Sequence, residues 1–229
     1  MTRPWGVKRR LRFTTLAAAL GGLAALSAAH AHPHVWATVR SEILFDADRH
    51  VTGVRHAWTF DEFYTAMAVQ GLDTDGDGKF SALELEPLAK VNVESLKDFD
   101  YFTFVHIGEN DALPMQEPRD YSLDFDDGHL TLHFTLPLEK PLDVGAEGVE
   151  VDVYDPSFFV AFGFAKEAPV KLSGSPVKGC SADVKVPDPE TAEDAKALSE
   201  SFFSQLGPGS NFGSQFAQTV TVRCGNAPS

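Results

Sequence analysis

The chain has 229 residues, with 33 Asp and Glu against 19 Lys and Arg, which gives a formal net charge of −14. This acidic balance argues against nucleic acid as a partner, because phosphate backbones are bound by basic surfaces. The length is sufficient for a single core, and no repeat or low-complexity run divides it.

The first 31 residues have the pattern of a secretory signal peptide. A basic start is followed by an uncharged, mostly apolar run over 13–26, which is too short to cross a bilayer as a helix. Ala29-His30-Ala31 supplies the small residues of a cleavage site, so we expect the mature chain to begin at His32. Removing 1–31 deletes five basic residues and no acidic one, and the formal charge becomes −19. We predict an exported protein, residues 32–229, that does not itself span the membrane.

Two strands follow, each with apolar residues at alternate positions. They cover 34–45 and 52–60, and the segment 46–49 predicts the turn of a hairpin between them. A turn centred within that segment places His34 opposite Asp61 at the end of the hairpin.

The segment 73–84, Asp-Thr-Asp-Gly-Asp-Gly-Lys-Phe-Ser-Ala-Leu-Glu, matches the twelve-residue calcium loop of an EF-hand without a gap. Three alternating aspartates come first, a glycine stands at the sixth position where the loop needs positive φ, and a glutamate closes the loop as a bidentate ligand. The seventh residue is expected to bind through its carbonyl, and the ninth directly or through a water. The predicted calcium ligands are Asp73, Asp75, Asp77, Lys79, Ser81 and Glu84.

The residues on both sides of this loop are typical of the two EF-hand helices, and the whole motif is predicted over 61–91. Ser81 is a suitable cap for the exiting helix. One face of the entering helix is expected to carry Phe60, Phe63, Met67 and Leu72, and the exiting helix carries Leu83, Leu85, Leu88 and Val91. The alternative is an ordinary surface turn rich in Asp and Gly.

The chain carries no second calcium loop. The nearest segment, 124–128, has its glycine one place early, and Thr135 stands where the closing glutamate is required. Because sensor EF-hands usually occur in pairs, a lone exported site is predicted to be structural, with a dissociation constant on the order of 10⁻⁴ to 10⁻³ M.

The second half of the chain is predicted to be mainly strands. A strand over 101–107 precedes a hairpin that turns at Asp127-Gly128 as a type I′ turn. That turn places three pairs on one apolar face: Tyr121 with Phe134, Leu123 with Leu132, and Phe125 with Leu130.

The remaining strands are predicted over 149–154, 158–164, 180–186 and 219–224, with an acidic helix over 191–206. Because 158–164 is apolar on both faces, it is expected to be a central strand covered on both sides. Cys180 and Cys224 are the only cysteines, and in an exported chain they most simply form one disulfide. The predicted fold is α+β, a mainly antiparallel, sandwich-like sheet structure with one inserted EF-hand.

The mature terminus offers a second, transition-metal site. The amine and imidazole of His32, the imidazole of His34 and the carboxylate of Asp61 or Glu62 together form a mixed nitrogen and oxygen set for zinc, nickel or copper. Pro33 has no amide hydrogen, which excludes the square-planar amino-terminal motif. The alternative is a terminus that carries two histidines by chance.

Three of the other histidines are not predicted to bind a metal ion. His56 shares an apolar face with Trp58 and is expected to be a hydrogen-bonded core residue. His129 and His133 lie roughly 13 Å apart along a strand, too far to share one ion, and are expected on the surface.

Five segments carry a resemblance to a known family: 32–36 (His-Pro-His-Val-Trp), 56–61 (His-Ala-Trp-Thr-Phe-Asp), the loop 73–84, 101–104 (Tyr-Phe-Thr-Phe) and 154–159 (Tyr-Asp-Pro-Ser-Phe-Phe). In these segments the chain resembles a family of bacterial periplasmic proteins of unknown function, described as the periplasmic component of an uncharacterised ABC-type transport system. The resemblance covers nearly all of the mature chain. It implies a periplasmic partner of an inner-membrane nickel, cobalt or zinc transporter.

We therefore expect a periplasmic, calcium-binding accessory or solute-binding component of divalent transition-metal transport. The alternative is a calcium-stabilised envelope binding or assembly module with no transition-metal role. An enzyme is not expected, because no nucleophile, base or phosphate loop follows from the spacing; a copper oxidase built on His32 would need a further histidine, and only His34 is available.

Overall fold

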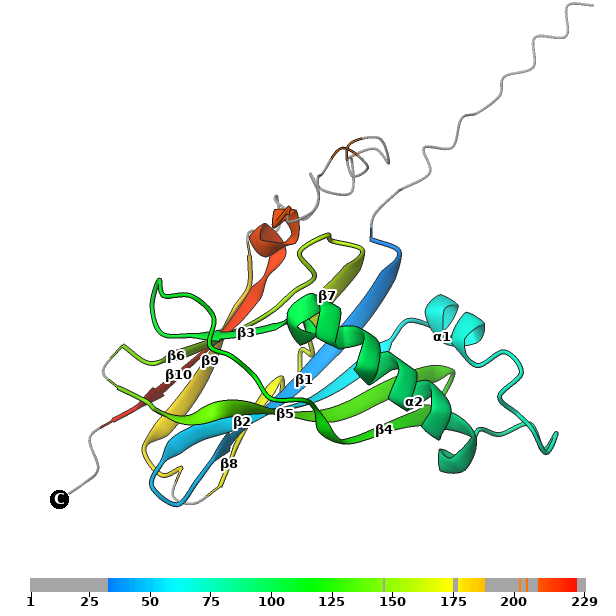
Figure 1. The fold of residues 1–229 in the computed structure, drawn as a ribbon, viewed down its shortest axis with the longest axis horizontal. Coiled ribbons are helices and arrows are strands. Elements are labelled where there is room, and N and C mark those ends of the chain that lie inside the picture. Colours follow the sequence, from blue (N-terminus) through cyan, green and yellow to red (C-terminus); the bar gives the residue numbers. More distant parts are fainter. Residues whose placement is uncertain are drawn as a thin grey trace, which may run out of the picture.

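The fold is described from a computed structural model, shown in Figure 1. The structure describes residues 33–145, 147–174, 177–187, 202, 205 and 210–225. The predicted signal peptide, His32 and all but two residues of the predicted helix 191–206 lie outside the described residues.

The larger of two β-sheets is the frame of the molecule. Its strand order is β4-β5-β2-β1-β7, and β8 pairs with β1 beyond the end of β7. The long strands β1 and β2 alternate buried and exposed side chains, as predicted from their sequence. The strands of this sheet are β1 (Val35–Phe45), β2 (His50–Phe60), β4 (Arg119–Asp126), β5 (His129–Asp143), β7 (Val160–Phe164) and β8 (Val170–Ser173).

The smaller sheet is antiparallel, and its strand order is β3-β6-β10-β9. The Cys180–Cys224 disulfide joins directly opposed residues of β9 and β10, which confirms the predicted bond. Such a bond is typical of proteins that fold outside the cytoplasm. The strands are β3 (Thr103–His106), β6 (Val149–Val153), β9 (Cys180–Lys185) and β10 (Gln218–Cys224).

One face of the larger sheet is covered by two different layers. The smaller sheet covers the half nearest the β1–β2 turn, where the buried side chains of both sheets form one cluster. Helix α2 (Ala82–Leu96) covers the other half, and Figure 1 shows it running alongside β4 and β5. The remaining helical elements are α1 (Glu62–Ala68), the 3₁₀ segment η1 (Lys97–Phe102) and η2 (Phe212–Phe216). This arrangement confirms the predicted α+β, sandwich-like fold.

His56 is a buried, hydrogen-bonded residue of this core, as predicted. Its Nδ1 accepts a hydrogen bond from the Ser41 hydroxyl at 2.9 Å. The Thr103 hydroxyl donates to the Tyr101 carbonyl, so it accepts from His56 Nε2–H at 3.2 Å. The neutral ring satisfies both partners, and desolvation by burial lowers the pKa of His56 to about 3.

The register of the first hairpin differs from the prediction by two residues. Ala37 lies opposite Phe60, so Trp36, and not His34, is the neighbour of Asp61. The cause is an irregularity between Leu44 and Phe45, beside the turn, which the centred-turn argument did not include.

The second hairpin turns as predicted. Asp127 and Gly128 both have positive φ, 45° and 80°, as a type I′ turn requires. The pairs Leu123–Leu132 and Phe125–Leu130 are formed. The third predicted pair is wrong, because the register shifts between Arg119 and Ser122 and leaves Tyr121 exposed.

Strand β7 is an edge strand, which corrects the expectation that 158–164 is central. The apolar residues in and just before the strand have separate partners. Phe162 packs inward on Trp58 and Phe102, whereas Phe158, just before the strand, stacks on Phe216 of η2.

The apolar residues of the two predicted EF-hand helices do not all face the core. In α1, Phe63 is 70 % exposed and Met67 is exposed, while Thr65 is buried and its hydroxyl accepts the N–H of Leu130 in β5. In α2 the buried stripe is Leu85, Ala89 and Val93, at the spacing of one helix face. Leu83 and Val91 lie outside that stripe and are exposed.

Candidate metal centre

The loop between α1 and α2 forms a tight turn with two glycines at positive φ. Gly76 and Gly78 have φ of 75° and 77°, and a Cβ at either position would meet open space, so only backbone strain selects glycine here. Asp73 accepts the N–H groups of residues 76, 77 and 78 and holds the curl of the chain. These bonds hold the backbone of the loop in a tight turn around the Asp73 carboxylate.

Glu84 closes the loop from the first turn of α2. Ser81 caps that helix, and its hydroxyl accepts the N–H of Glu84 while the Glu84 carboxylate accepts the N–H of Ser81. The other carboxylate oxygen accepts the N–H and hydroxyl of Thr74 at 2.7 and 2.9 Å. The backbone hydrogen bonds of Ser81 and Thr74 lower the pKa of Glu84 to about 2, so the group is ionised at neutral pH.

Three of the predicted ligands already converge. Carboxylate oxygens of Asp73, Asp75 and Glu84 lie within 4.8 Å of one another. Asp77, two residues after Asp75, accepts the N–H of Lys79 with one carboxylate oxygen, at 2.8 Å. This all-oxygen set fits a hard divalent cation such as calcium.

The loop is fixed to the sheet from both sides. Phe80 packs edge to face on Phe125 of β4, with ring centroids 4.7 Å apart. On the entering side, the Thr65–Leu130 hydrogen bond joins α1 to β5. His129 adds a bond from its Nδ1 to the Phe60 carbonyl at 2.8 Å.

The residues of the predicted transition-metal site are only partly described. Asp61 caps α1, and its two oxygens accept the N–H groups of Tyr64 and Trp36, each at 2.9 Å. The His34 ring packs on Phe159, 4.8 Å between centroids. His32 lies outside the described residues, so the three-residue site stays a prediction.

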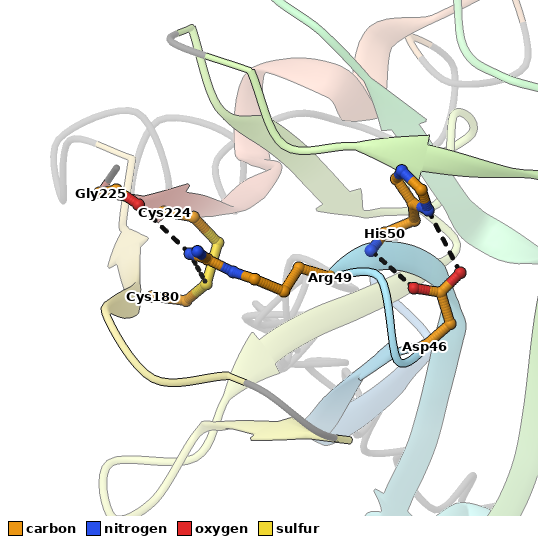
Figure 2. Close-up of a disulfide and its surroundings, with 6 residues drawn as sticks. All are labelled: Asp46, Arg49, His50, Cys180, Cys224 and Gly225. Carbon is orange, nitrogen blue, oxygen red and sulfur yellow. Dashed lines mark hydrogen bonds and ion pairs between the residues drawn. A yellow bond between two sulfur atoms is a disulfide. The ribbon is translucent and has the colours of Figure 1, made fainter. Parts of the chain in front are cut away.

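A second carboxylate and imidazole cluster was not predicted. In the β1–β2 turn, ligand atoms of Asp46, Asp48 and His50 lie within 4.8 Å of one another. In Figure 2, one Asp46 oxygen accepts the backbone N–H of His50, at 2.9 Å, and the other lies 3.3 Å from the His50 ring nitrogen Nδ1. The N–H of Asp48 also donates to Asp46, so this carboxylate stabilises the turn. Among the described residues, three carboxylate or imidazole groups converge in two places, this turn and the loop between α1 and α2.

Arg49 in the same turn reaches the disulfide. Figure 2 shows its guanidinium between Cys180 and Gly225, with Nη2 at 3.5 Å from the Cys180 sulfur and 3.2 Å from the Gly225 carbonyl. This contact ties the β1–β2 turn of the larger sheet to the end of the smaller one. The contact between Arg49 and Cys180 could not be predicted from the sequence, because the two residues are 131 positions apart.

No helix of the described part of the chain is long and apolar enough to cross a membrane.

Comparison with known proteins identifies the family. The model of the family described as "Protein of unknown function (DUF1007)" matches residues 17–224. An uncharacterized protein of Haemophilus influenzae is 23% identical over 196 residues, which cover 85% of this chain and 91% of that protein. An uncharacterized 15.5 kDa protein from the trpE 3′ region of Spirochaeta aurantia is 35% identical over 100 residues, 44% of this chain and 70% of that protein. Since the family match spans most of its length, this chain belongs to the DUF1007 family of proteins of unknown function.

Proposed function

We propose that this protein is an exported calcium-binding protein whose single EF-hand is held in place by calcium. The observation that carries the proposal is the convergence of Asp73, Asp75 and Glu84 within 4.8 Å around a turn of two positive-φ glycines. Asp77 would add a fourth carboxylate, Lys79 a carbonyl and Ser81 a hydroxyl or a bridging water. The ion would neutralise mutual repulsion between these carboxylates.

Calcium is expected to act structurally. Phe80 and Thr65 attach the loop and α1 to the β4–β5 hairpin, so an ion that orders the loop also stabilises this attachment. The Glu84 carboxylate already accepts four hydrogen bonds, and we expect the ion to replace some of those from the Thr74 and Ser81 hydroxyls.

In its cellular role, we propose that the protein is a periplasmic accessory or solute-binding component of divalent transition-metal transport, working with an inner-membrane transporter. The family resemblance and the strongly acidic chain, which attracts cations, support this role. The transported metal would be cargo for His32, His34 and Asp61, distinct from the calcium in the loop.

A second candidate function is a calcium-stabilised envelope binding or assembly module without a transition-metal role. It is favoured by the geometry of Asp61, whose two oxygens are already used by backbone N–H groups. A metal at Asp61 would have to compete with the cap of α1.

The test is native mass spectrometry and isothermal titration of the protein purified from a periplasm and stripped with chelator. We expect one calcium with a dissociation constant of about 10⁻⁴ to 10⁻³ M. Glu84→Gln should remove it, whereas Glu86→Gln, on the exposed side of α2 two residues on, removes the same charge and should leave it. Equal binding by both variants would overturn the calcium site.

The same measurement separates the two cellular roles. With zinc, nickel or copper added to the calcium form, a second ion that is lost in His34→Ala supports metal handling. Calcium alone, with no second ion at any of the three metals, supports the assembly module.

A further inference from the structure

The Cys180–Cys224 disulfide closes one end of the smaller sheet. Cys180 begins β9, which is the end strand of that sheet, and Cys224 ends β10. Both cysteines are only partly buried and pack against the apolar cluster between the two sheets. The two strands pair along the whole of β9, and the pairing continues past the disulfide, where the Gly225 N–H donates to the Gly179 carbonyl at 2.9 Å. Backbone hydrogen bonds therefore hold these strands together independently of the disulfide.

A partly buried arginine lies against this disulfide. Arg49 Nη2 is 3.5 Å from the Cys180 sulfur and 3.2 Å from the Gly225 carbonyl (Figure 2). Its Nε is shielded from solvent and has no acceptor among the described residues. In the same part of the chain, no carboxylate lies within ion-pair distance of this guanidinium. A cation that loses hydration without gaining an anion is costly, and the side-chain atom that it contacts here is a sulfur.

The β1–β2 turn directs Arg49 toward the disulfide. Arg49 has φ of 68°, in the left-handed region that residues other than glycine seldom adopt. Asp46 holds the turn in this shape by accepting the N–H groups of Asp48 and His50. Figure 2 shows Asp46 and His50 on one side of the turn and the Arg49 side chain extending to the other. The carboxylate of Asp46 therefore does not neutralise the guanidinium.

The remaining charged groups near the disulfide do not oppose an anion there. Residues alternate between the two faces of a strand, so Asp183 of β9 and Arg223 of β10 point away from the face that carries the cysteines. The next pair on the cysteine face is Ala182 with Val222, and both pack in the apolar cluster. Lys178, in the turn before β9, is exposed and cationic. A thiolate formed at this disulfide would therefore meet positive charge and apolar surface.

We propose that the Cys180–Cys224 bond is a thiol–disulfide exchange site for a dithiol reductant, and that Arg49 is a positioning residue that stabilises the Cys180 thiolate. Neighbouring cations favour the thiolate form of a cysteine, and the more stable thiolate is the better leaving group. Cys180 is therefore the sulfur that leaves and Cys224 the sulfur that is attacked. The site is separate from the calcium loop and does not rest on the function proposed above.

The exchange takes place in two steps. One thiol of the dithiol loses its proton to solvent, and the resulting thiolate attacks Cys224 Sγ. A mixed disulfide forms, and the electron pair of the broken bond leaves with Cys180 as a thiolate beside Arg49. The second sulfur of the dithiol then gives its proton to Cys224 and attacks the reductant's own sulfur in the mixed disulfide, which releases Cys224 as a thiol. The dithiol is oxidised to a disulfide, and the protein gains two electrons.

The first test is the pKa of each thiol, followed by the ultraviolet absorbance of the thiolate in the calcium-saturated protein. In Cys224→Ser we expect Cys180 to have a pKa of about 7.5 or lower, against about 8.5 for a free thiol. Adding Arg49→Met should return this pKa to about 8.5, and Arg49→Lys, which keeps the charge, should restore part of the shift. The matched control is Cys180→Ser, in which Cys224 should respond less to Arg49→Met because Arg49 contacts the other sulfur. An unshifted Cys180, or an equal response of the two thiols, would overturn the proposal.

The second test measures the disulfide itself, by equilibrium of the two-cysteine protein with reduced and oxidised dithiothreitol. At pH 8, Arg49→Met should lower the equilibrium constant for reduction about three-fold, the effect of changing one thiol pKa from about 7.5 to about 8.5. At pH 6.5 both thiols are mostly protonated, so the two proteins should agree. A purely structural contact would change the constant equally at both pH values, and that result would contradict the proposal.

A third measurement needs no substitution and holds even if Arg49→Met fails to fold. The reduced wild-type protein is treated at pH 7 with a limiting amount of iodoacetamide, which reacts with thiolates, and the labelled peptides are identified by mass spectrometry. We expect Cys180 to be alkylated before Cys224. Equal labelling, or earlier labelling of Cys224, would show that Arg49 does not favour the Cys180 thiolate.

Discussion

Phe80 of the predicted calcium loop packs edge to face on Phe125 of β4, with ring centroids 4.7 Å apart. Phe80 is the eighth residue of the loop, the position that in paired EF-hands faces a second loop. In this chain the β4–β5 hairpin contacts Phe80 instead, and Phe125 stands two residues before the turn at Asp127 and Gly128. The predicted EF-hand is therefore packed against the larger sheet of the same chain.

Replacing Phe80 by Ala is expected to weaken calcium binding and lower the melting temperature, because the loop loses its attachment to the sheet. In a double-mutant cycle with Phe125→Ala, the coupling should be about 0.5 to 1.5 kcal/mol, the range for an aromatic pair. Leu83→Ala is the control. Leu83 is 81 % exposed at the start of α2, so this substitution should have little effect on calcium affinity or melting temperature. Additive effects of the two phenylalanine substitutions would contradict this attachment.

Gly78→Ala is expected to lower both calcium affinity and folding stability. The alanine has open space but must adopt φ near 77°, at a cost of about 1 to 2 kcal/mol. Gly128→Ala is a close match, with φ of 80° and open space in the β4–β5 turn. Chemical unfolding should show a similar loss for both, and calorimetric titration should show weaker calcium binding only for Gly78→Ala. Equal calcium affinity in the two variants would mean that the loop at Gly78 does not shape the site.

The second hairpin and the convergence of carboxylates in the 73–84 loop could be predicted because their determinants are local. Calcium binding by that loop stays a prediction. Ligand spacing within 73–84 and the positive φ of Asp127 and Gly128 depend on a few adjacent residues. The buried faces of α1 and α2 could not be predicted equally well. Ala89 belongs to the buried stripe of α2, whereas Leu83 does not, and hydrophobicity alone favours the opposite choice.

Features built from residues that are far apart in the chain could not be predicted from sequence patterns. An apolar cavity brings Trp58 of β2, Asn92 of α2 and Phe162 of β7 together, and no spacing rule relates them. Strand β7 was misplaced for a related reason. Its apolar residues on both faces predict a central strand, but one face packs on the core through Phe162 and the neighbouring Phe158 packs on η2.

Histidine 56 is expected to make the fold sensitive to acid. Its pKa is about 3 in the folded protein and near 6.5 when unfolded, so between these values the unfolded chain binds one more proton. This contribution is fully present above pH 6.5 and is lost as the pH falls toward 3, at about 1.4 kcal/mol per pH unit. Urea unfolding of wild type and His56→Gln from pH 7.5 to 4, with calcium in excess, should show a stability difference that shrinks with acidification.

The control for His56 is His133→Gln. His133 lies on the outer face of β5, 3.0 Å from Asp124, and is partly exposed. The substitution removes a histidine from the same sheet without opening the core. If both variants changed with pH to the same extent, burial of His56 would not be the source of the acid sensitivity.

Histidine 106 is expected to have the opposite effect, because both of its ring nitrogens face acceptors. Nε2 lies 2.9 Å from Asp152 Oδ2 and Nδ1 2.7 Å from the Gly108 carbonyl, so both nitrogens must carry a hydrogen. Burial by itself lowers the pKa of His106, but these bonds outweigh it and raise the pKa above 6.5. The stabilisation is therefore fully present below pH 6.5 and is lost as the pH rises through the raised pKa. Urea unfolding from pH 5.5 to 9 should show that the advantage of wild type over His106→Gln falls as the pH rises, and that Asp152→Asn flattens this dependence; an advantage that grows with pH would rule out the charged ring.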